Sequence, residues 1–293
     1  MNQRRQEAQR GKKVEGRKRK ADEQPRGLPS GSLRVSVPLW LISCFAAAIF
    51  TFGVAPAQSG GSSQNASAGP ADRPAARNDD PTWVNKHKEL VERAKKGNID
   101  LYFAGDSITR RWEATHRANW DQNFGGWKAA DFGAGGDRTQ NLLYRIENGE
   151  LDGVHPKVIV LMIGTNNVGF VPVAGSDEAL VEDVTRGIKA CLDAMRRKAP
   201  GAKILLMGIT PRNTNGSTAL MPTISKINER IARFADGKTI RFLNINDKLA
   251  DKDGKLYDGM TDDGLHLTDK GYQVWADAMR PILTEWLGPP AKK

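Results

Sequence analysis

Residues that form disulfides or bind metals are scarce in this chain. Its 293 residues include two cysteines, Cys44 and Cys191, and four histidines. One cysteine lies in a hydrophobic run and the other in a predicted helix, so we expect no disulfide framework. No Cys/His spacing typical of a metal site occurs, and the aspartates from 251 to 263 lack the spacing and the closing glutamate of an EF-hand loop. The sequence therefore predicts no metal site.

Cofactor loops and internal repeats are also missing. The run Gly133-Ala134-Gly135-Gly136 lacks the third glycine that a dinucleotide-binding loop has at its required spacing. No repeat indicates a solenoid or a propeller. We expect a protein without a cofactor, whose 39% hydrophobic residues are enough to form a buried core.

Positive charge is concentrated at the N-terminus. Residues 1–34 hold eleven Lys or Arg and four acidic residues, which accounts for +7 of the net +10. A basic stretch such as Arg17-Lys18-Arg19-Lys20 is typical of proteins that bind nucleic acid or an anionic surface. The hydrophobic run that follows favours a different role, a basic cytoplasmic tail, so we expect no nucleic-acid partner.

Residues 35–57 form an uncharged, mostly apolar run that is long enough to cross a membrane. Positive charge before the run predicts that the N-terminus stays cytoplasmic and that the chain after it is exported. Ala55-Pro56-Ala57 resembles a signal-peptide cleavage site. We therefore predict a membrane anchor, or a secreted or periplasmic protein if the run is cleaved. Lipidation at Cys44 is disfavoured, because apolar and small residues follow it.

Residues 58–80 have the composition of a flexible linker. They are rich in Gly, Ser, Ala, Pro and Asn and contain almost no large apolar residue, so they cannot bury enough surface to fold. We predict that the folded domain covers residues 81–293.

Strands and helices alternate in this predicted domain. Short apolar runs predict five strands, over residues 99–104, 128–132, 157–163, 203–209 and 239–245. Apolar residues at helical spacing predict helices over 83–96, after Ser107, and over 139–148, 177–198, 224–235 and 269–287. This alternation predicts an α/β domain whose parallel sheet is covered by helices on both faces.

Ser107 follows the first predicted strand. Gly105 breaks the strand, and helix-like sequence begins after the serine. In an open α/β sheet, ligands bind at the carboxyl ends of the strands, and a serine there can lie near the positive end of a helix. Ser107 is therefore a candidate nucleophile, although Gly-Asp-Ser is also ordinary turn sequence.

His266 is the candidate base for this serine. It stands in an acidic loop just before the last helix, and Asp263 precedes it by three residues. One tight turn lets the carboxylate hold the imidazole Nδ1–H while Nε2 faces Ser107. The alternative is a histidine in a helix-capping loop. We expect the other histidines elsewhere: His87 and His155 in solvent and His116 in a charged helix.

Two further residues can stabilise an oxyanion. Gly136 offers a backbone N–H at a predicted helix start, and Asn166 offers a side-chain amide after the central strand. Alternatively, Gly136 makes a tight turn and Asn166 caps it. Because both follow strands of one parallel sheet, we expect them near Ser107.

Four sequence blocks resemble those of the SGNH, or GDSL-like, hydrolase family. They are Gly105-Asp106-Ser107, Gly136-Asp137, Gly164-Thr165-Asn166-Asn167 and Asp263-Gly264-Leu265-His266. The resemblance is strongest to the catalytic subunits of intracellular platelet-activating-factor acetylhydrolase. It includes Phe132–Asp137 and Arg145–Leu151 and extends over about residues 101–287.

The resemblance implies a flavodoxin-like three-layer sandwich with a five-stranded parallel sheet. It also implies a Ser107, His266 and Asp263 triad, with an oxyanion hole made by Ser107 N–H, Gly136 N–H and Asn166. Ile108 stands where the family name has leucine. The N-terminal run is foreign to the intracellular enzymes, which argues against their phospholipid substrate.

We therefore expect a serine esterase that hydrolyses short acyl esters, chiefly acetyl. The predicted export favours acetylated carbohydrate as substrate, and the absence of a long apolar insertion favours a shallow acyl site. The alternatives are a lysophospholipase or thioesterase, an O-acetyltransferase, and a tethered binding module without chemistry. The sequence does not indicate an oligomeric state.

Overall fold

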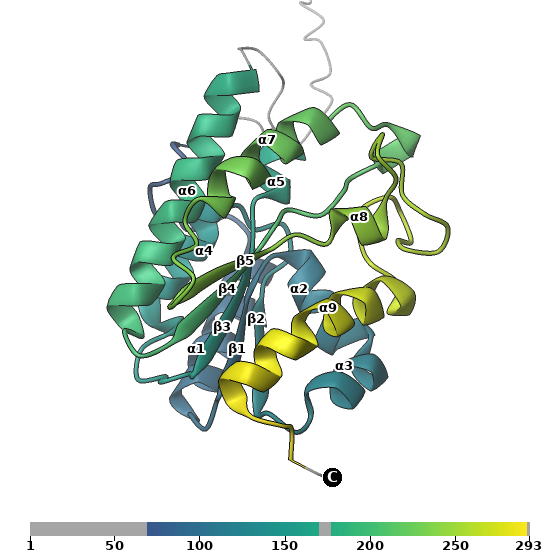
Figure 1. The fold of residues 1–293 in the computed structure, drawn as a ribbon. Helices are drawn as coiled ribbons and strands as arrows, with labels where there is room; N and C mark the ends of the chain where they lie inside the picture. The colour runs from purple at the N-terminus through teal and green to yellow at the C-terminus, as the bar shows by residue number, and fades with distance from the viewer. Residues whose placement is uncertain (1–68, 170–176, 292–293) are drawn as a thin grey trace, which may run out of the picture. The chain divides into compact units, whose positions relative to one another are not determined.

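The computed structural model describes residues 69–169 and 177–291, which form an α/β fold (Figure 1). Its five strands are all parallel, in the order β2-β1-β3-β4-β5. They are β1 (Leu101–Gly105), β2 (Ala129–Gly133), β3 (Val158–Met162), β4 (Lys203–Met207) and β5 (Ile240–Leu243). The predicted five-stranded parallel sheet is confirmed. The winding reverses between β1 and β3, which is where ligands bind in such sheets.

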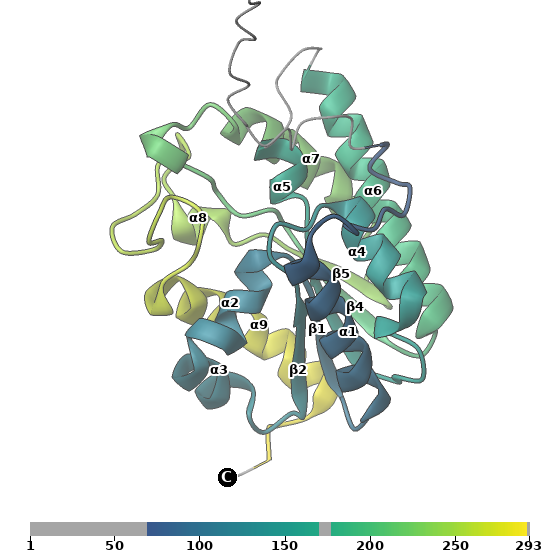
Figure 2. The ribbon, with the colours of Figure 1, turned by 180° about the vertical axis from the view of Figure 1, so that it is seen from behind.

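Helices cover both faces of the sheet and make three layers (Figures 1 and 2). One face carries α1 (Pro81–Lys95), α4 (Thr139–Arg145), α6 (Asp177–Lys198) and α7 (Met221–Ala232). The other carries α2 (Ser107–Thr115), α3 (Arg117–Phe124) and α9 (Asp269–Leu287). The short helices α5 (Thr165–Gly169) and α8 (Asn246–Leu249) follow β3 and β5. This is the flavodoxin-like arrangement that the family resemblance implies.

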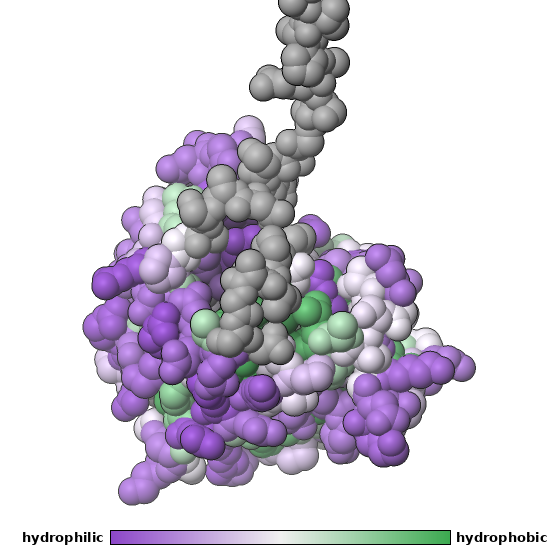
Figure 3. Space-filling model, turned by 90° about the horizontal axis from the view of Figure 1, so that it is seen from above, coloured by the Kyte–Doolittle hydropathy of each residue, from purple (hydrophilic) through white to green (hydrophobic). Residues whose placement is uncertain are grey.

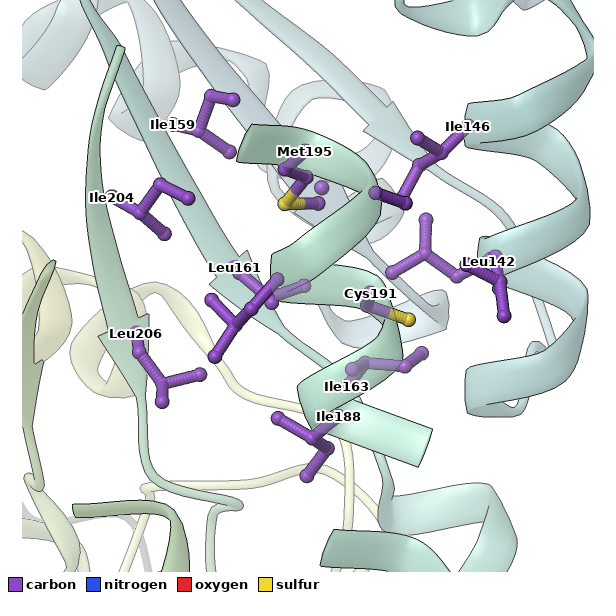
Figure 4. Packing of buried hydrophobic residues seen from close by; sticks show 14 of the residues in the cluster. Leu142, Ile146, Ile159, Leu161, Ile163, Ile188, Cys191, Met195, Ile204 and Leu206 are labelled. Carbon is purple, nitrogen blue, oxygen red and sulfur yellow. The ribbon is translucent and has the colours of Figure 1, made fainter. Parts of the chain in front are cut away.

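Alternation along the strands divides the apolar residues between two cores, because successive strand side chains point to opposite faces. Tyr102 belongs to the core under α1, α4, α6 and α7, whereas Phe103 belongs to the core under α2, α3 and α9. Figure 4 shows the first core, where Cys191 and Met195 of α6 pack with Leu161 of β3. Cys191 is a buried free thiol.

Several helix limits differ from the predicted ones. The helix predicted over 139–148 ends at Arg145, because Asn148 and Gly149 leave helical geometry within a π-helical turn, Ile146–Glu150. The helical stretch after Ser107 is split into α2 and α3 at His116. The last helix is capped by Thr268, whose hydroxyl accepts a hydrogen bond from Gly271 N–H at 3.2 Å.

Residues 69–80 pack against the domain, so the linker prediction is wrong for this part. Ala71 is fully buried, and its carbonyl accepts a hydrogen bond from Thr139 Oγ1 at 2.8 Å. Its N–H donates to the Asp183 carboxylate at 3.2 Å. Hydrogen bonds of the backbone hold this segment, and large apolar side chains do not. Its composition therefore did not predict that it packs against the domain.

The predicted tail over 1–34, the hydrophobic run over 35–57 and linker residues 58–68 lie outside the described residues. Among the helices of the described segments, none combines the length and the apolar composition that a bilayer span requires. The anchor and the signal peptide therefore stay predictions.

A buried carboxyl in β2 predicts a pH-dependent stability. Asp131 is 5% exposed, and its Oδ1 accepts a hydrogen bond from Gly133 N–H at 2.6 Å. Its Oδ2 has no hydrogen-bond partner among the residues that the structure describes. Burial raises the pKa of Asp131 to about 7. Since the unfolded pKa is about 3.9, this group favours folding while protonated, and that stability is lost as the pH rises through 7.

Asp131→Asn should flatten this dependence, because asparagine stays neutral. Between pH 5 and 8, the free energy of unfolding of the wild type should fall more than that of the variant, by about 1–3 kcal/mol. Urea unfolding at several pH values measures both slopes. Equal slopes would contradict the raised pKa.

Candidate active site

Ser107 begins helix α2 directly after strand β1. The preceding Asp106 caps this helix, and its carboxylate accepts a hydrogen bond from Ile108 N–H at 2.9 Å. Burial raises the pKa of Asp106 to about 7. A Cβ on Gly105 would lie 2.4 Å from the Met162 carbonyl oxygen of β3, so only glycine fits where the strand turns into the helix. The turn places Ser107 just beyond the carboxyl end of β1, at the edge of the sheet where the strands end.

Ser107, His266 and Asp263 are joined by two hydrogen bonds. His266 Nε2 lies 2.9 Å from Ser107 Oγ, and His266 Nδ1 lies 2.7 Å from Asp263 Oδ2. Ser107 is 9% exposed and the His266 side chain 19%, so a substrate can still reach both. The structure thus brings together the hydroxyl, imidazole and carboxylate that the sequence suggested, in the order that activates a serine.

Backbone N–H groups of the acidic loop fix the position of the Asp263 carboxylate. Asp263 Oδ1 accepts hydrogen bonds from Leu265 N–H at 3.0 Å and from His266 N–H at 2.8 Å. Burial acts to raise the pKa of Asp263, but the hydrogen bonds and charge of His266 outweigh it, and the pKa lies below its ordinary value. Asp263 is therefore ionised at neutral pH and can accept the Nδ1–H of His266.

Asn166 lies in the first turn of α5, and Gly136 lies in the loop after β2. Asn166 is 3% exposed, and its Nδ2 donates a hydrogen bond to the Asp137 carbonyl oxygen at 2.9 Å. This bond joins the start of α5, which follows β3, to the loop after β2, next to Gly136. An amide nitrogen carries two hydrogens, so Asn166 keeps a second one to offer a bound group. Ala134 N–H donates to the Gly105 carbonyl at 3.2 Å, which ties the Gly136 loop to the strand before Ser107.

Arg145 connects the strand ends beneath this site. Its buried guanidinium donates to the carbonyl oxygens of Gly105 at 3.1 Å and Phe132 at 3.0 Å, the ends of β1 and β2. It also pairs with Asp137 Oδ2 at 2.7 Å and with Glu150. Burial acts to lower the pKa of Arg145, but the two carboxylates outweigh it and raise the pKa, so the guanidinium stays charged.

His87 belongs to the same buried network. Its Nδ1 lies 2.7 Å from a Glu150 carboxylate oxygen, and its side chain is 15% exposed. The prediction of a solvated His87 is therefore wrong, because Glu150, far away in the sequence, supplies a partner. His155 is exposed as predicted, and His116 bonds to the Asp269 carboxylate at 2.9 Å.

The segment after β4 links two loops of the site. Arg212 Nη1 donates to the Thr165 carbonyl oxygen at 3.1 Å, directly before Asn166. Asn213 N–H donates to the Gly264 carbonyl oxygen at 2.7 Å, inside the acidic loop. These contacts were not foreseen from the sequence, since an arginine and an asparagine after a strand carry no distinctive pattern.

A large groove lies elsewhere. It encloses about 900 Å³ beside α7 and α8, and Phe242, Asn246 and Tyr257 are among its lining residues. Neither Ser107 nor His266 lines it. The reacting groups instead lie at the carboxyl edge of the sheet, the side seen from above in Figure 3, where the visible coloured surface is mostly hydrophilic with several hydrophobic areas. Within the described ranges, no cluster of His, Cys, Asp and Glu could hold a metal ion.

Comparison with known proteins identifies the family. Residues 103–274 match the sequence model of the GDSL-like lipase/acylhydrolase family. The chain belongs to this family. It is 31% identical over 223 residues to the platelet-activating factor acetylhydrolase IB subunit alpha1 of Bos taurus, covering 74% of this chain and 90% of that protein. This GDSL-like acylhydrolase is therefore an enzyme that acts on esters.

Solved structures share the fold of this GDSL-like acylhydrolase. A GDSL-like lipase from Bacteroides thetaiotaomicron aligns with a TM-score of 0.52 and 20% identity, over 70% of this chain and 96% of that one. An acetyl xylan esterase, AlAXEase, aligns with a TM-score of 0.51 and 22% identity, over 63% and 100%. At these identities the likeness concerns the fold alone.

Proposed function

We propose that this acylhydrolase is a serine esterase that removes short acyl groups, chiefly acetyl, from carbohydrates. The observation that carries the proposal is the position of His266 Nε2, 2.9 Å from Ser107 Oγ, while its other ring nitrogen faces Asp263. A base within hydrogen-bond reach of a hydroxyl, oriented by a carboxylate, is what a serine nucleophile needs.

The reaction proceeds in two steps. Ser107 Oγ attacks the ester carbonyl while His266 Nε2 takes the hydroxyl proton, and the same proton then leaves with the alcohol. Water, deprotonated by His266, next attacks the acyl-serine and releases the acid. Asp263 stays ionised throughout and stabilises the imidazolium that forms in each step.

Ser107 N–H, Gly136 N–H and Asn166 Nδ2 donate hydrogen bonds that stabilise the negative charge developing on the carbonyl oxygen. The hydrogen bond from Asn166 to the Asp137 carbonyl holds the amide in place before substrate binds. Donors fixed in advance lower the barrier because they need not reorganise during the reaction.

Two observations support an acetyl group on a carbohydrate. Platelet-activating factor acetylhydrolase and acetyl xylan esterase, two of the proteins compared above, both carry names that refer to acetyl groups. The hydrophobic run over 35–57 predicts export, which brings the domain into contact with extracellular polysaccharide. Lysophospholipid or thioester hydrolysis and O-acetyl transfer are the other outcomes of the test below.

A substrate panel tests the acyl length and the acceptor. We expect kcat/KM for p-nitrophenyl acetate to exceed that for the octanoate by about tenfold or more, since a shallow site gains nothing from added methylenes. Acetate should also be released from acetylated xylan. Preference for octanoate would favour the lysophospholipase or thioesterase reading, and transfer of acetyl to an added sugar hydroxyl would favour a transferase.

A further inference from the structure

The geometry points to a substrate that carries an anionic group, a carboxylate or a phosphate, close to the ester, and we propose that Arg110 binds this anion. The inference rests on the proposed esterase function and names the kind of substrate that the site prefers. It comes from three observations: an unpaired guanidinium, its position beside the Gly136 loop, and the charges around it.

Arg110 has no partner of its own within the described residues. Its Nε is buried without a hydrogen-bond partner, and no ion pair or side-chain hydrogen bond joins Arg110 to another described residue. Arg110 as a whole is partly exposed, but a buried polar atom such as its Nε costs free energy when it has no partner. An anion from the substrate would supply the missing acceptor, with the planar guanidinium matched to carboxylate or phosphate oxygens.

Arg110 lies close to the reacting groups. It follows Ser107 by three residues on helix α2, so both side chains are on the same face. A Cβ on Gly135 would lie 3.7 Å from Arg110 Nε and 4.0 Å from its Nη2. The guanidinium is therefore next to the glycine that precedes Gly136, on the loop expected to hold the oxyanion.

A second guanidinium borders the same loop. Arg77 Nη1 donates to the Gly135 carbonyl oxygen at 2.7 Å and would lie 3.2 Å from a Cβ on Gly136. Its own charge is balanced by Asp80 at 2.6 Å and by Asp137 at 3.4 Å. Arg77 thus shapes the loop, and Arg110 remains the group that can receive an anion.

The other charges of the site do not cancel Arg110. Arg138 follows Asp137, and its pKa is lowered by burial and, to a smaller extent, by the charge of Arg77. The carboxylate of Asp137 is buried and paired with Arg145 at 2.7 Å. A guanidinium beside the Gly136 loop attracts an anionic substrate to the site.

The test compares matched acetyl esters with the full-length protein. The neutral ester is an acetylated methyl glucoside, and the anionic ones are the corresponding methyl glucuronide and acetyl glycerol phosphate. The quantity compared is kcat/KM for an anionic ester divided by kcat/KM for the neutral ester. We expect this ratio to exceed one in the wild type. Arg110→Gln should lower this ratio about 10- to 100-fold, mainly through KM, and Arg110→Lys, which keeps the charge, should restore part of it.

Arg117→Gln is the matched control, because this arginine on α3 is exposed and pairs with Asp121 and Glu113. Its ratio should equal that of the wild type. Rising salt should lower the wild-type ratio by screening, a measurement that needs no variant. Comparing kcat/KM for the glucuronide with kcat/KM for the glycerol phosphate ester shows whether Arg110 prefers a carboxylate or a phosphate.

Two results would overturn the proposal: a wild type that does not distinguish anionic from neutral esters, or an unchanged ratio in Arg110→Gln. If Arg110 only stabilised the oxyanion, its replacement would slow all three esters alike. Failure to cleave any of the three would instead contradict the esterase function itself, so the two failures are separable.

Discussion

Replacing Ser107 by alanine lowers kcat for acetyl esters by about 10⁴- to 10⁶-fold, the largest effect expected of any single substitution in this protein. The variant lacks the hydroxyl oxygen that His266 Nε2 faces at 2.9 Å, so no acyl-enzyme can form on Ser107. Initial rates with p-nitrophenyl acetate measure the loss. Residual hydrolysis would come from direct attack of water on the bound ester, because the Gly136 and Asn166 donors can still stabilise the oxyanion.

The fold should survive this substitution. The Ser107 hydroxyl bonds to the His266 ring, and removing one oxygen at a site that is 9% exposed leaves no large cavity. The melting temperature should therefore stay close to that of the wild type. His266→Ala should cost about as much activity, and the double variant little more, because the two groups act as a unit. Activity of Ser107→Ala within tenfold of the wild type would contradict the assigned role.

Replacing Arg145 by methionine should lower the free energy of unfolding by about 3–5 kcal/mol, the largest stability effect expected. Methionine fills much of the volume but removes the guanidinium that pairs with the buried carboxylates of Asp137 and Glu150. Asp137 then keeps only its longer contact with Arg77 and its bond from Trp83, and Glu150 keeps His87. The substitution also frees the Gly105 and Phe132 carbonyls from their shared donor. Urea unfolding measures the change.

Arg197→Met provides the control, since this exposed arginine on α6 pairs with Glu147 at the surface. Its effect should stay within about 0.5 kcal/mol. Arg145→Lys should be intermediate, because lysine keeps the charge but cannot serve four acceptors on different segments. A loss below about 1 kcal/mol for Arg145→Met would show that the buried network does not hold the strand ends together.

Structure could be predicted from the sequence where apolar residues recur at a regular spacing or where one residue type is scarce. Each strand is a short apolar run ended by glycine or polar residues, so the parallel sheet and its edge could be predicted. Residues 157–163 contain β3, and the run ends at Gly164 as expected. The pairing of Ser107 with His266 followed from the scarcity of histidine and from the acidic loop around His266.

Other contacts depend on positions that only the folded chain defines. Arg145 was noticed as part of a resemblance, but its acceptors lie on four segments brought together by the sheet. Arg77 was assigned to a linker because Gly, Ser and Pro surround it, whereas backbone hydrogen bonds order this segment. No sequence pattern singles out Arg110, and it is distinguished only by the buried Nε that has no hydrogen-bond partner among the described residues.

Covalent labelling tests the central claim, that Ser107 is a nucleophile activated by His266. A fluorophosphonate reacts with such serines, and peptide mass spectrometry locates the adduct. We expect one adduct on Ser107, formed at least about a hundredfold more slowly in His266→Ala and absent from Ser107→Ala. Labelling of another residue, or an equal rate of Ser107 labelling without His266, would contradict the account.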